Sequence, residues 1–488
     1  MLPNQFFWIA ILAASVAMPL FVAAQPSPTP PAATADAQDP TNRWSETAYG
    51  ISLTPPPGTM QWDGPSTLWA SPQGYTVGFE LITSEVPFNL EQVAASVMVQ
   101  MGFARSFPRL VADEQGQPVQ PRPERIAERP GIQMFFDVTG DDGREWLYGQ
   151  AVVMLEPHAA AVLKVQSPAE TASQARAAFA QTLASLHVPL ATELDRQRGA
   201  LIEAGEAWLQ TLTPESLKAA APASKTYRIQ QGDRELGYLQ LGSTADPDIL
   251  QRRGYEPAGL LFRQVRREYL DDRMLDTEQE AYASDDGRRE VWSHKSTVRP
   301  SDQRPAAAGL PRDTPAREAI TWAQTGVRGD QELRGRMVNA ITVISEAPPA
   351  SAAADQIRQH ERFLGQRQKL GLKGLPQVKE WARPDKGYLP QITDALLPML
   401  LPAAEADYAF TAYHAPSGEP TLRTVSVRTT PEGHKLVVDH PTPRSSPIRH
   451  VFDHQNRHLY TLYPSGVTLR PATAEELAEA WGQRPPAP

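Results

Sequence analysis

Three histidines near the C-terminal end of the chain have a spacing that would suit a divalent metal ion. His450, His454 and His458 follow one another at intervals of four residues. On a helix this spacing places three imidazoles on one face, where they would bind a metal together. The local sequence instead predicts a hairpin, with a strand over 448–452 and a turn at 453–456, so that His450 and His458 face each other across it. A metal site and solvated turn histidines both remain open as interpretations.

Charged residues of both signs crowd into the segment between Arg263 and Arg299. A pair of carboxylates in this segment would supply the general acid and base of a hydrolase. The pattern singles out no pair, and it equally predicts a solvated sheet face covered by cross-strand ion pairs. The residues concerned are Arg266, Arg267, Glu268, Asp271, Asp272, Glu278, Glu280, Arg288, Arg289 and Glu290.

Several classes of chemistry are excluded or disfavoured by what the sequence lacks. The chain has no cysteine, which excludes disulfides, thiolate nucleophiles, cysteine-ligated zinc and iron–sulfur clusters. The short motifs of zinc proteases, α/β-hydrolases, P-loop proteins and dinucleotide-binding proteins are also missing. We therefore assign no catalytic residue and expect no cofactor.

One strongly apolar segment, 389–401, is the best candidate for a ligand-binding element. Pro398 interrupts this segment, which predicts a kinked helix or two short pieces. The segment is either a core helix packed on a sheet or a movable cover over an apolar pocket, since unbranched leucine and methionine side chains adapt to varied ligands. In the second case the ligand-binding residues are Ile392, Leu396, Leu397, Met399 and Leu400.

The N-terminal segment predicts export. Residues 6–24 are uncharged and apolar, and they end in Val22-Ala23-Ala24, the small residues that signal peptidase reads. We interpret residues 1–24 as a signal peptide cleaved after Ala24; the alternative is a single N-terminal membrane anchor. Both place the bulk of the chain in the periplasm or outside the cell. The chain has 47 Lys and Arg against 56 Asp and Glu, a net charge of −9, and no basic run, so we expect no nucleic-acid partner.

The first folded unit is expected over residues 43–188, after a Pro/Ala-rich linker at 25–42. Alternating apolar residues predict strands, Asn89 with Gln92 predicts a capped helix, and Ser167 to Glu170 predict a capping box that opens a second helix. The unit is therefore an antiparallel-sheet layer sandwich with flanking helices. The order from Tyr49-Gly50-Ile51-Ser52-Leu53 and Pro55-Pro56-Pro57-Gly58 to the closing Leu183-Ala184-Ser185-Leu186 resembles the PsbP/Mog1/DcrB-like exported domains. This resemblance implies a non-enzymatic binding or accessory role.

Linking helices are expected over 189–224, followed by a larger antiparallel β domain over 225–483 with a helical insertion at 350–402 and a frayed tail at 484–488. About a dozen strands predict one curved sheet, which completes an α+β fold class. The hairpin from Tyr227-Arg228-Ile229 to Gly237-Tyr238, the Asp285-Asp286-Gly287 turn and the apolar helix together resemble the half-barrel of LolA-type lipid and lipoprotein carriers.

Taken together, these patterns predict an exported, two-domain, non-catalytic binding protein of the cell envelope. Its expected partner is an apolar small molecule or lipid, or another envelope protein, and it meets the membrane only through an uncleaved N-terminal segment. The rival hypothesis is a secreted hydrolase with a carboxylate acid/base pair in the C-terminal domain.

Overall fold

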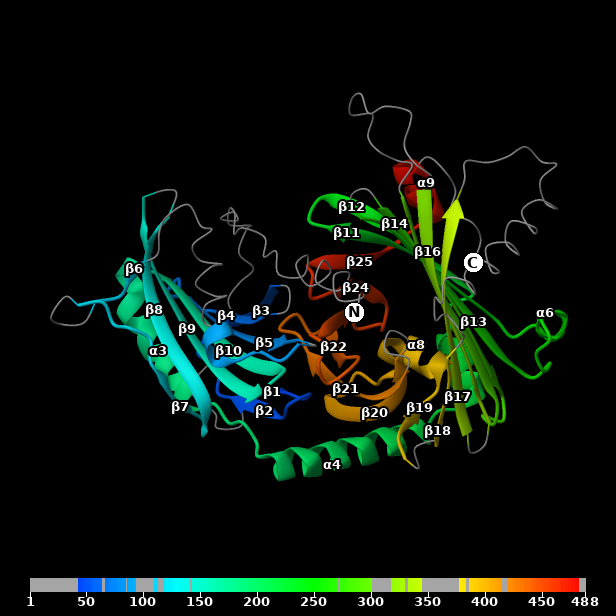
Figure 1. The fold of residues 1–488 in the computed structure, drawn as a ribbon, viewed down its shortest axis with the longest axis horizontal. Coiled ribbons are helices and arrows are strands. Elements are labelled where there is room, and N and C mark those ends of the chain that lie inside the picture. Colours follow the sequence, from blue (N-terminus) through cyan, green and yellow to red (C-terminus); the bar gives the residue numbers. More distant parts are fainter. Residues whose placement is uncertain are drawn as a thin grey trace, which may run out of the picture.

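The chain forms a small N-terminal sheet and a large C-terminal sheet, with helices on their faces, which confirms the predicted α+β class (Figure 1). The computed structural model describes residues 43–481 except 64–65, 85, 94–108, 113–116, 141–142, 271–272, 301–316, 330–331, 345–376, 383–385 and 415–418. The expected signal peptide and linker, most of the 350–402 insertion and the 484–488 tail lie outside the described residues.

The N-terminal unit is built on an antiparallel sheet of eight strands, because runs of alternating apolar residues give each strand one face to bury. The order is β3-β4-β5-β10-β9-β8-β6, with β7 also paired to β8, and a separate hairpin, β1–β2, packs beside it. The strands are β1 (Trp44–Glu46), β2 (Ile51–Leu53), β3 (Thr59–Asp63), β4 (Ser66–Ala70), β5 (Thr76–Thr83), β6 (Arg109–Leu110), β7 (Pro123–Ile126), β8 (Arg129–Thr139), β9 (Glu145–Glu156) and β10 (Ala159–Pro168).

Helix α3 (Ala172–Ala184) closes one face of this sheet and buries Ala175 and Phe179 in its core. The predicted capping box at its start is wrong. The Ser167 hydroxyl bonds to the Pro168 carbonyl and the Thr171 side chain, and a short 3-10 turn, η1 (Ala169–Thr171), precedes the helix without a side-chain cap. The other predicted cap is confirmed, because Asn89 and Gln92 exchange side-chain-to-backbone hydrogen bonds.

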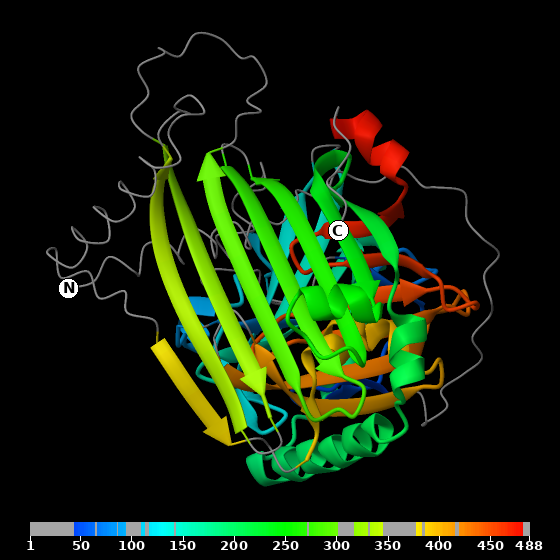
Figure 2. The ribbon, with the colours of Figure 1, turned by 90° about the vertical axis from the view of Figure 1, so that its right-hand side faces the viewer.

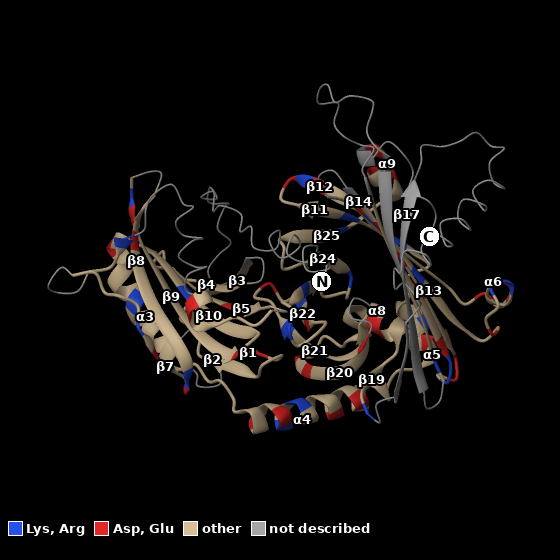
Figure 3. Ribbon diagram, viewed as in Figure 1, with Lys and Arg blue, Asp and Glu red and all other residues tan. Residues whose placement is uncertain are grey.

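Two helices connect the sheets. Helix α4 (Ala191–Leu209) packs on the large sheet through Trp208. Acidic and basic residues are mixed along the helix (Figure 3). Helix α5 (Pro214–Ala220) starts at Thr213, whose hydroxyl accepts the Ser216 N–H in a reciprocal capping box.

The large sheet has fifteen strands in the order β18-β17-β16-β15-β14-β13-β12-β11-β25-β24-β23-β22-β21-β20-β19, all antiparallel except the short β19–β20 pairing (Figure 2). Its bounds are β11 (Ser224–Gln231), β12 (Arg234–Thr244), β13 (Gly259–Leu270), β14 (Arg273–Ser284), β15 (Glu290–Pro300), β16 (Arg317–Arg328), β17 (Glu332–Ile344), β18 (Gln377–Ala382), β19 (Tyr388–Leu389), β20 (Ala406–His414), β21 (Glu419–Thr429), β22 (Lys435–His440), β23 (Ile448–Phe452), β24 (His458–Leu462) and β25 (Val467–Ala472). The insertion predicted as helical thus contains a strand, β18, which pairs with β17.

The sheet curves around helix α8 (Gln391–Leu400), and we call the face that carries α8 the concave face and the opposite one the outer face (Figure 1). Two shorter helices lie elsewhere: α6 (Pro247–Arg252) between β12 and β13, and α9 (Ala474–Trp481) at the C-terminal end. No helix among the described residues is long and apolar enough to cross a membrane.

Candidate functional site: a helix held in the concave face of the large sheet

Helix α8 fills the concave face and separates two apolar clusters. Its residues Ile392 and Leu396 join a cluster from α5, β11–β15, β19, β20 and β25, whereas Leu397 joins a cluster from α4 and β19–β23. Met399 and Leu400 are half-buried and contact both clusters. The five residues predicted to bind a ligand therefore lie between the helix and the sheet. The segment is a single ten-residue helix with Pro398 in its last turn, so the prediction of two separate pieces is wrong.

A buried carboxylate holds the N-terminal end of α8. Glu290 on β15 is fully buried and accepts the backbone N–H of Gln391, the first residue of the helix. Its other oxygen accepts hydrogen bonds from Arg328 Nε at 3.0 Å and from the Tyr388 hydroxyl at 3.3 Å. An anion at a helix N-terminus is favourable, because it meets the free N–H groups and the positive end of the helix dipole. Burial nevertheless raises the pKa of Glu290, against the opposing effect of Arg328.

A buried arginine holds the middle of the helix. Arg423 on β21 pairs with Asp394 of α8 and makes two bonds, at 2.8 and 2.7 Å, to the carboxylate of Asp439 on β22. Pro398 has no N–H to give to the Asp394 carbonyl, and Arg423 Nη1 lies 3.4 Å from that oxygen. Burial works to raise the pKa of Asp439, but Arg423 outweighs it and holds the value at about 2.

A buried lysine holds the C-terminal end. Lys435 on β22 donates to the carbonyls of Pro398 and Leu401, both at 3.1 Å, and its ammonium lies 4.2 Å from the ring centre of Phe452. A cation at this position satisfies carbonyls that have no partner within the helix. Burial lowers the pKa of Lys435 to about 8.

The predicted hairpin around the three histidines is confirmed, with β23 and β24 pairing across the turn. The expectation that His450 and His458 face each other is wrong, because His450 stands opposite Thr461 and His458 opposite Phe452. His450 Nδ1 and His458 Nε2 both contact the Thr461 hydroxyl, at 2.9 and 2.8 Å, whereas His454 is exposed in the turn. Each buried imidazole thus uses one nitrogen on the threonine, and burial lowers the pKa of His458 to about 3. The structure does not bring the three histidines together, and no group of three or more ligand-type side chains gathers to hold a metal among the described residues.

Thr461 also takes part in an arrangement that has the order of a catalytic triad. His450 Nε2 lies 3.9 Å from the Asp439 carboxylate, and its Nδ1 faces the threonine oxygen. A nucleophile must meet its substrate, however, and Thr461 is only 1% exposed with its hydroxyl shared between two imidazoles. We therefore interpret this polar row of Asp439, His450, Thr461 and His458 as part of the packed interior of the sheet rather than as an active site.

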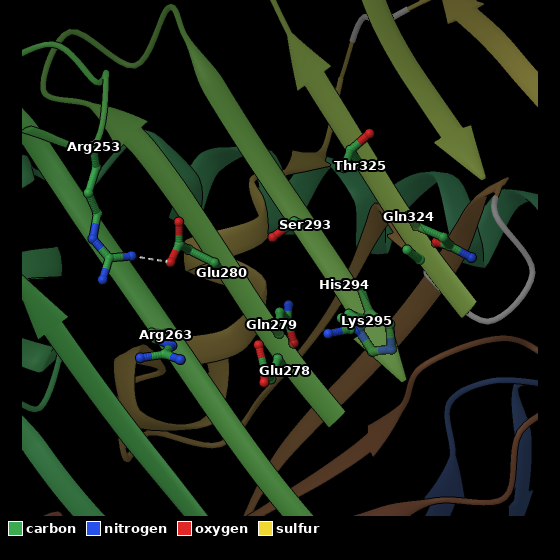
Figure 4. A pocket seen from close by; sticks show the side chains of 11 residues that line it. Arg253, Arg263, Glu278, Gln279, Glu280, Ser293, His294, Lys295, Gln324 and Thr325 are labelled. Atoms are coloured by element: carbon green, nitrogen blue, oxygen red, sulfur yellow. Dashed lines mark hydrogen bonds and ion pairs between the residues drawn. The ribbon is translucent and has the colours of Figure 1, made fainter. Parts of the chain in front are cut away.

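The charged strands form a pocket of about 320 Å³ across β13–β16 (Figure 4). Glu280, one of its carboxylates, is bound by Arg253 at 2.5 Å and by the Tyr255 hydroxyl at 3.0 Å. Glu278 stands directly opposite Lys295 in the β14–β15 register. Neighbouring carboxylates are likewise matched with cations, as in Arg267–Asp276 at 2.6 Å. The pocket does not isolate a carboxylate pair of the kind that the hydrolase hypothesis needs.

Reasoning from the sequence named Glu290 only as one of the charged residues between Arg263 and Arg299, and it missed Arg423 and Lys435 as residues that hold α8. One signal was available in β22, where Lys435 and Asp439 flank the apolar run Leu436-Val437-Val438. Charges within an apolar strand are buried only when they are paired. A second signal was Asp394, the one charged residue of α8.

No family model matches the chain, and no curated protein matches it either.

Proposed function

We propose that the protein is an exported, non-catalytic binding protein of the cell envelope, and that its large sheet carries an apolar ligand on the surface that α8 covers. The observation that supports this proposal is the way α8 is held. Its apolar side chains fill the concave face, while Glu290, Arg423 and Lys435 attach it from three separate strands.

The two kinds of contact differ in what happens when the helix moves away. The charged groups of the sheet become exposed to water when α8 moves away, so the loss of their bonds to the helix is partly offset by solvation. The apolar strip left on the sheet, including Leu239, Trp292 and Tyr413, has no such compensation. Burial of apolar surface is worth roughly 25 cal/mol per Å². An apolar ligand that covers this strip would therefore stabilise the displaced position of α8.

Locking α8 in place tests this proposal. The Asn456 side chain in the β23–β24 turn donates to the Met399 carbonyl at 3.1 Å, so these two positions are close enough to be bridged. The chain has no cysteine of its own. The two cysteines of a Met399→Cys, Asn456→Cys double variant can therefore be joined by a short cross-linker with two thiol-reactive groups. Binding of a fluorescent fatty acid is measured before and after joining.

We expect saturable binding in the wild type and in the unjoined variant, and a loss of at least tenfold in affinity after joining. The Asn456→Cys single variant treated with the same reagent is the matched control and should bind as before, because Asn456 is not one of the proposed ligand-binding residues. Absence of saturable binding in the wild type, or unchanged binding after joining, would contradict the carrier proposal.

A further inference from the structure

The two units meet through polar contacts. Every apolar cluster among the described residues lies wholly within the N-terminal unit or wholly within the rest of the chain. The N-terminal unit packs on the outer face of β21–β23, the face opposite to α8 (Figure 1). Polar interfaces between domains permit relative motion, because little apolar surface is exposed when they part.

One buried contact across this interface joins Glu46, the last residue of β1, to His440, the last residue of β22. Their side chains are 5% and 1% exposed, and Glu46 Oε1 lies 3.0 Å from His440 Nε2. The same carboxylate accepts the backbone N–H groups of Ala48 and Tyr49 at 2.8 and 2.9 Å. These donors help to hold the pKa of Glu46 below its ordinary value, in spite of burial.

The geometry around His440 demands two ring protons. Its Nδ1 lies 3.1 Å from the backbone carbonyl oxygen of Ser445, and its Nε2 faces the Glu46 carboxylate. Both partners are acceptors, and a neutral imidazole has only one N–H to donate. Both contacts are satisfied only by the imidazolium, so loss of the proton removes one hydrogen bond and leaves a buried carboxylate without its cation.

The surrounding charged groups already have partners. On β21, Arg428 pairs with Asp407 at 2.6 Å and contacts the Ser45 hydroxyl at 3.3 Å. On β23, Arg449 contacts the Thr67 hydroxyl at 3.3 Å. Arg444 pairs with Glu156, which also accepts a hydrogen bond from the Tyr49 hydroxyl. Arg198 of α4 donates to the Ala48 carbonyl, and the hydroxyls of Thr47 and Ser426 bond to each other. Asp439, next to His440, points to the concave face and pairs with Arg423. Carboxylates, phenols and guanidinium groups ordinarily titrate far from neutral pH. His440 is therefore the group of this set whose protonation state changes near neutral pH.

We infer that the Glu46–His440 pair is a pH-dependent latch between the two units, closed when His440 is protonated and loosened when it is not. The sign follows from linkage. Glu46 and Ser445 raise the pKa of His440, against burial, above its ordinary value of 6.5. The latch therefore has its full strength below pH 6.5, and it weakens as the pH rises through the raised pKa of His440.

Energy transfer between dyes on the two units measures this directly. Because the chain has no cysteine, Gln73→Cys in the β4–β5 turn and Arg288→Cys in the β14–β15 turn give specific labelling of the full-length mature protein. Both positions are exposed. The transfer efficiency is followed from pH 5 to pH 9 in this background and in the His440→Gln, Glu46→Gln and His454→Gln variants.

We expect a plateau below pH 6.5 and a fall in transfer with a midpoint above pH 6.5. His440→Gln and Glu46→Gln should each abolish the transition, whereas His454→Gln, which alters an exposed histidine in a turn, should keep it. A pH-independent efficiency in the labelled parent would overturn the inference. So would a transition that survives in either latch variant. If one latch variant does not fold, the parent curve and the other variant still decide the question.

Discussion

Replacing Arg423 with methionine should remove the central attachment of α8 and destabilise the large sheet. The guanidinium is the partner of the buried carboxylate of Asp439 and the half-buried carboxylate of Asp394, and it contacts the Asp394 carbonyl that Pro398 leaves free. Removing one partner of a buried ion pair typically costs about 3–5 kcal/mol. Arg423 and His450 together, against burial, hold the pKa of Asp439 at about 2 instead of 3.8, and this net shift corresponds to roughly 2 kcal/mol at neutral pH.

The variant should also show a stronger pH dependence. Burial raises the pKa of Asp394 even beside Arg423, and without that cation burial raises the pKa of both carboxylates. The folded state then binds protons that the unfolded state does not. The free energy of unfolding of Arg423→Met should therefore increase as the pH falls from 7 to 5. In the wild type the contribution of Asp439 is constant over that range and is lost only as the pH falls from about 4 towards 2.

Urea unfolding followed by far-ultraviolet circular dichroism at pH 7 and pH 5 checks both effects. Arg288→Met is the matched control, because that exposed arginine lies 3.9 Å from its nearest carboxylate, and it should change stability by no more than about 0.5 kcal/mol. A loss below about 1 kcal/mol for Arg423→Met, or equal losses at the two pH values, would refute the assignment of Arg423 as the central attachment.

Three further outcomes follow from individual contacts. Gly326→Ala would place a Cβ 1.8 Å from the Trp292 ring, so we expect a loss of about 1–3 kcal/mol and altered tryptophan fluorescence, whereas Gly329→Ala, in open space, should change neither. Thr461→Val leaves two imidazole nitrogens without their partner, and urea unfolding should show a loss of about 1–3 kcal/mol; an unchanged midpoint would contradict this account of the polar row. N-terminal sequencing of the exported protein should begin at Gln25, and recovery of the uncut chain in membranes would favour the anchor.

Local patterns predicted much of the fold because strands, turns and caps are local. The Asp285-Asp286-Gly287 turn and the β23–β24 hairpin have their predicted positions. The long-range pairing that joins the two halves of the large sheet was not predictable in this way. Strand β11 pairs with β25, so that Thr226 stands opposite Ala472, and nothing in either segment identifies the other as its neighbour. Pairing between such distant segments depends on the whole sheet rather than on local sequence.

The candidate site likewise has local features that the sequence predicts and long-range contacts that it does not. The strongly apolar segment 389–401 predicted α8, because such a segment must pack against something in the interior. It did not predict Glu290 or Arg423, since a charged residue in a strand has the same local pattern whether it faces water or a buried helix end. The Glu46–His440 pair joins residues on different units, and only the packing of one unit on the other makes that glutamate and that histidine partners.

Strand β22 connects the two features that the structure defines. Asp439 points to the concave face and helps to hold α8 through Arg423, and the next residue, His440, points to the N-terminal unit. The negative charge of Asp439 also contributes to the raised pKa of His440. Removing that charge should make the imidazolium less stable, although the bond from Arg423 can still be accepted by an amide oxygen.

Asp439→Asn should therefore shift the midpoint of the latch transition to lower pH, as measured by energy transfer between the same two labelled positions. The matched control is Asp286→Asn, in the distant β14–β15 turn, which should leave the midpoint unchanged. A shift of one pH unit in the midpoint corresponds to a coupling free energy of about 1.4 kcal/mol between the two faces of the strand. A shift of a few tenths of a unit therefore reports a coupling well below that value. An unchanged midpoint would show that the concave face and the latch are electrostatically independent, and an upward shift would contradict the sign of the argument.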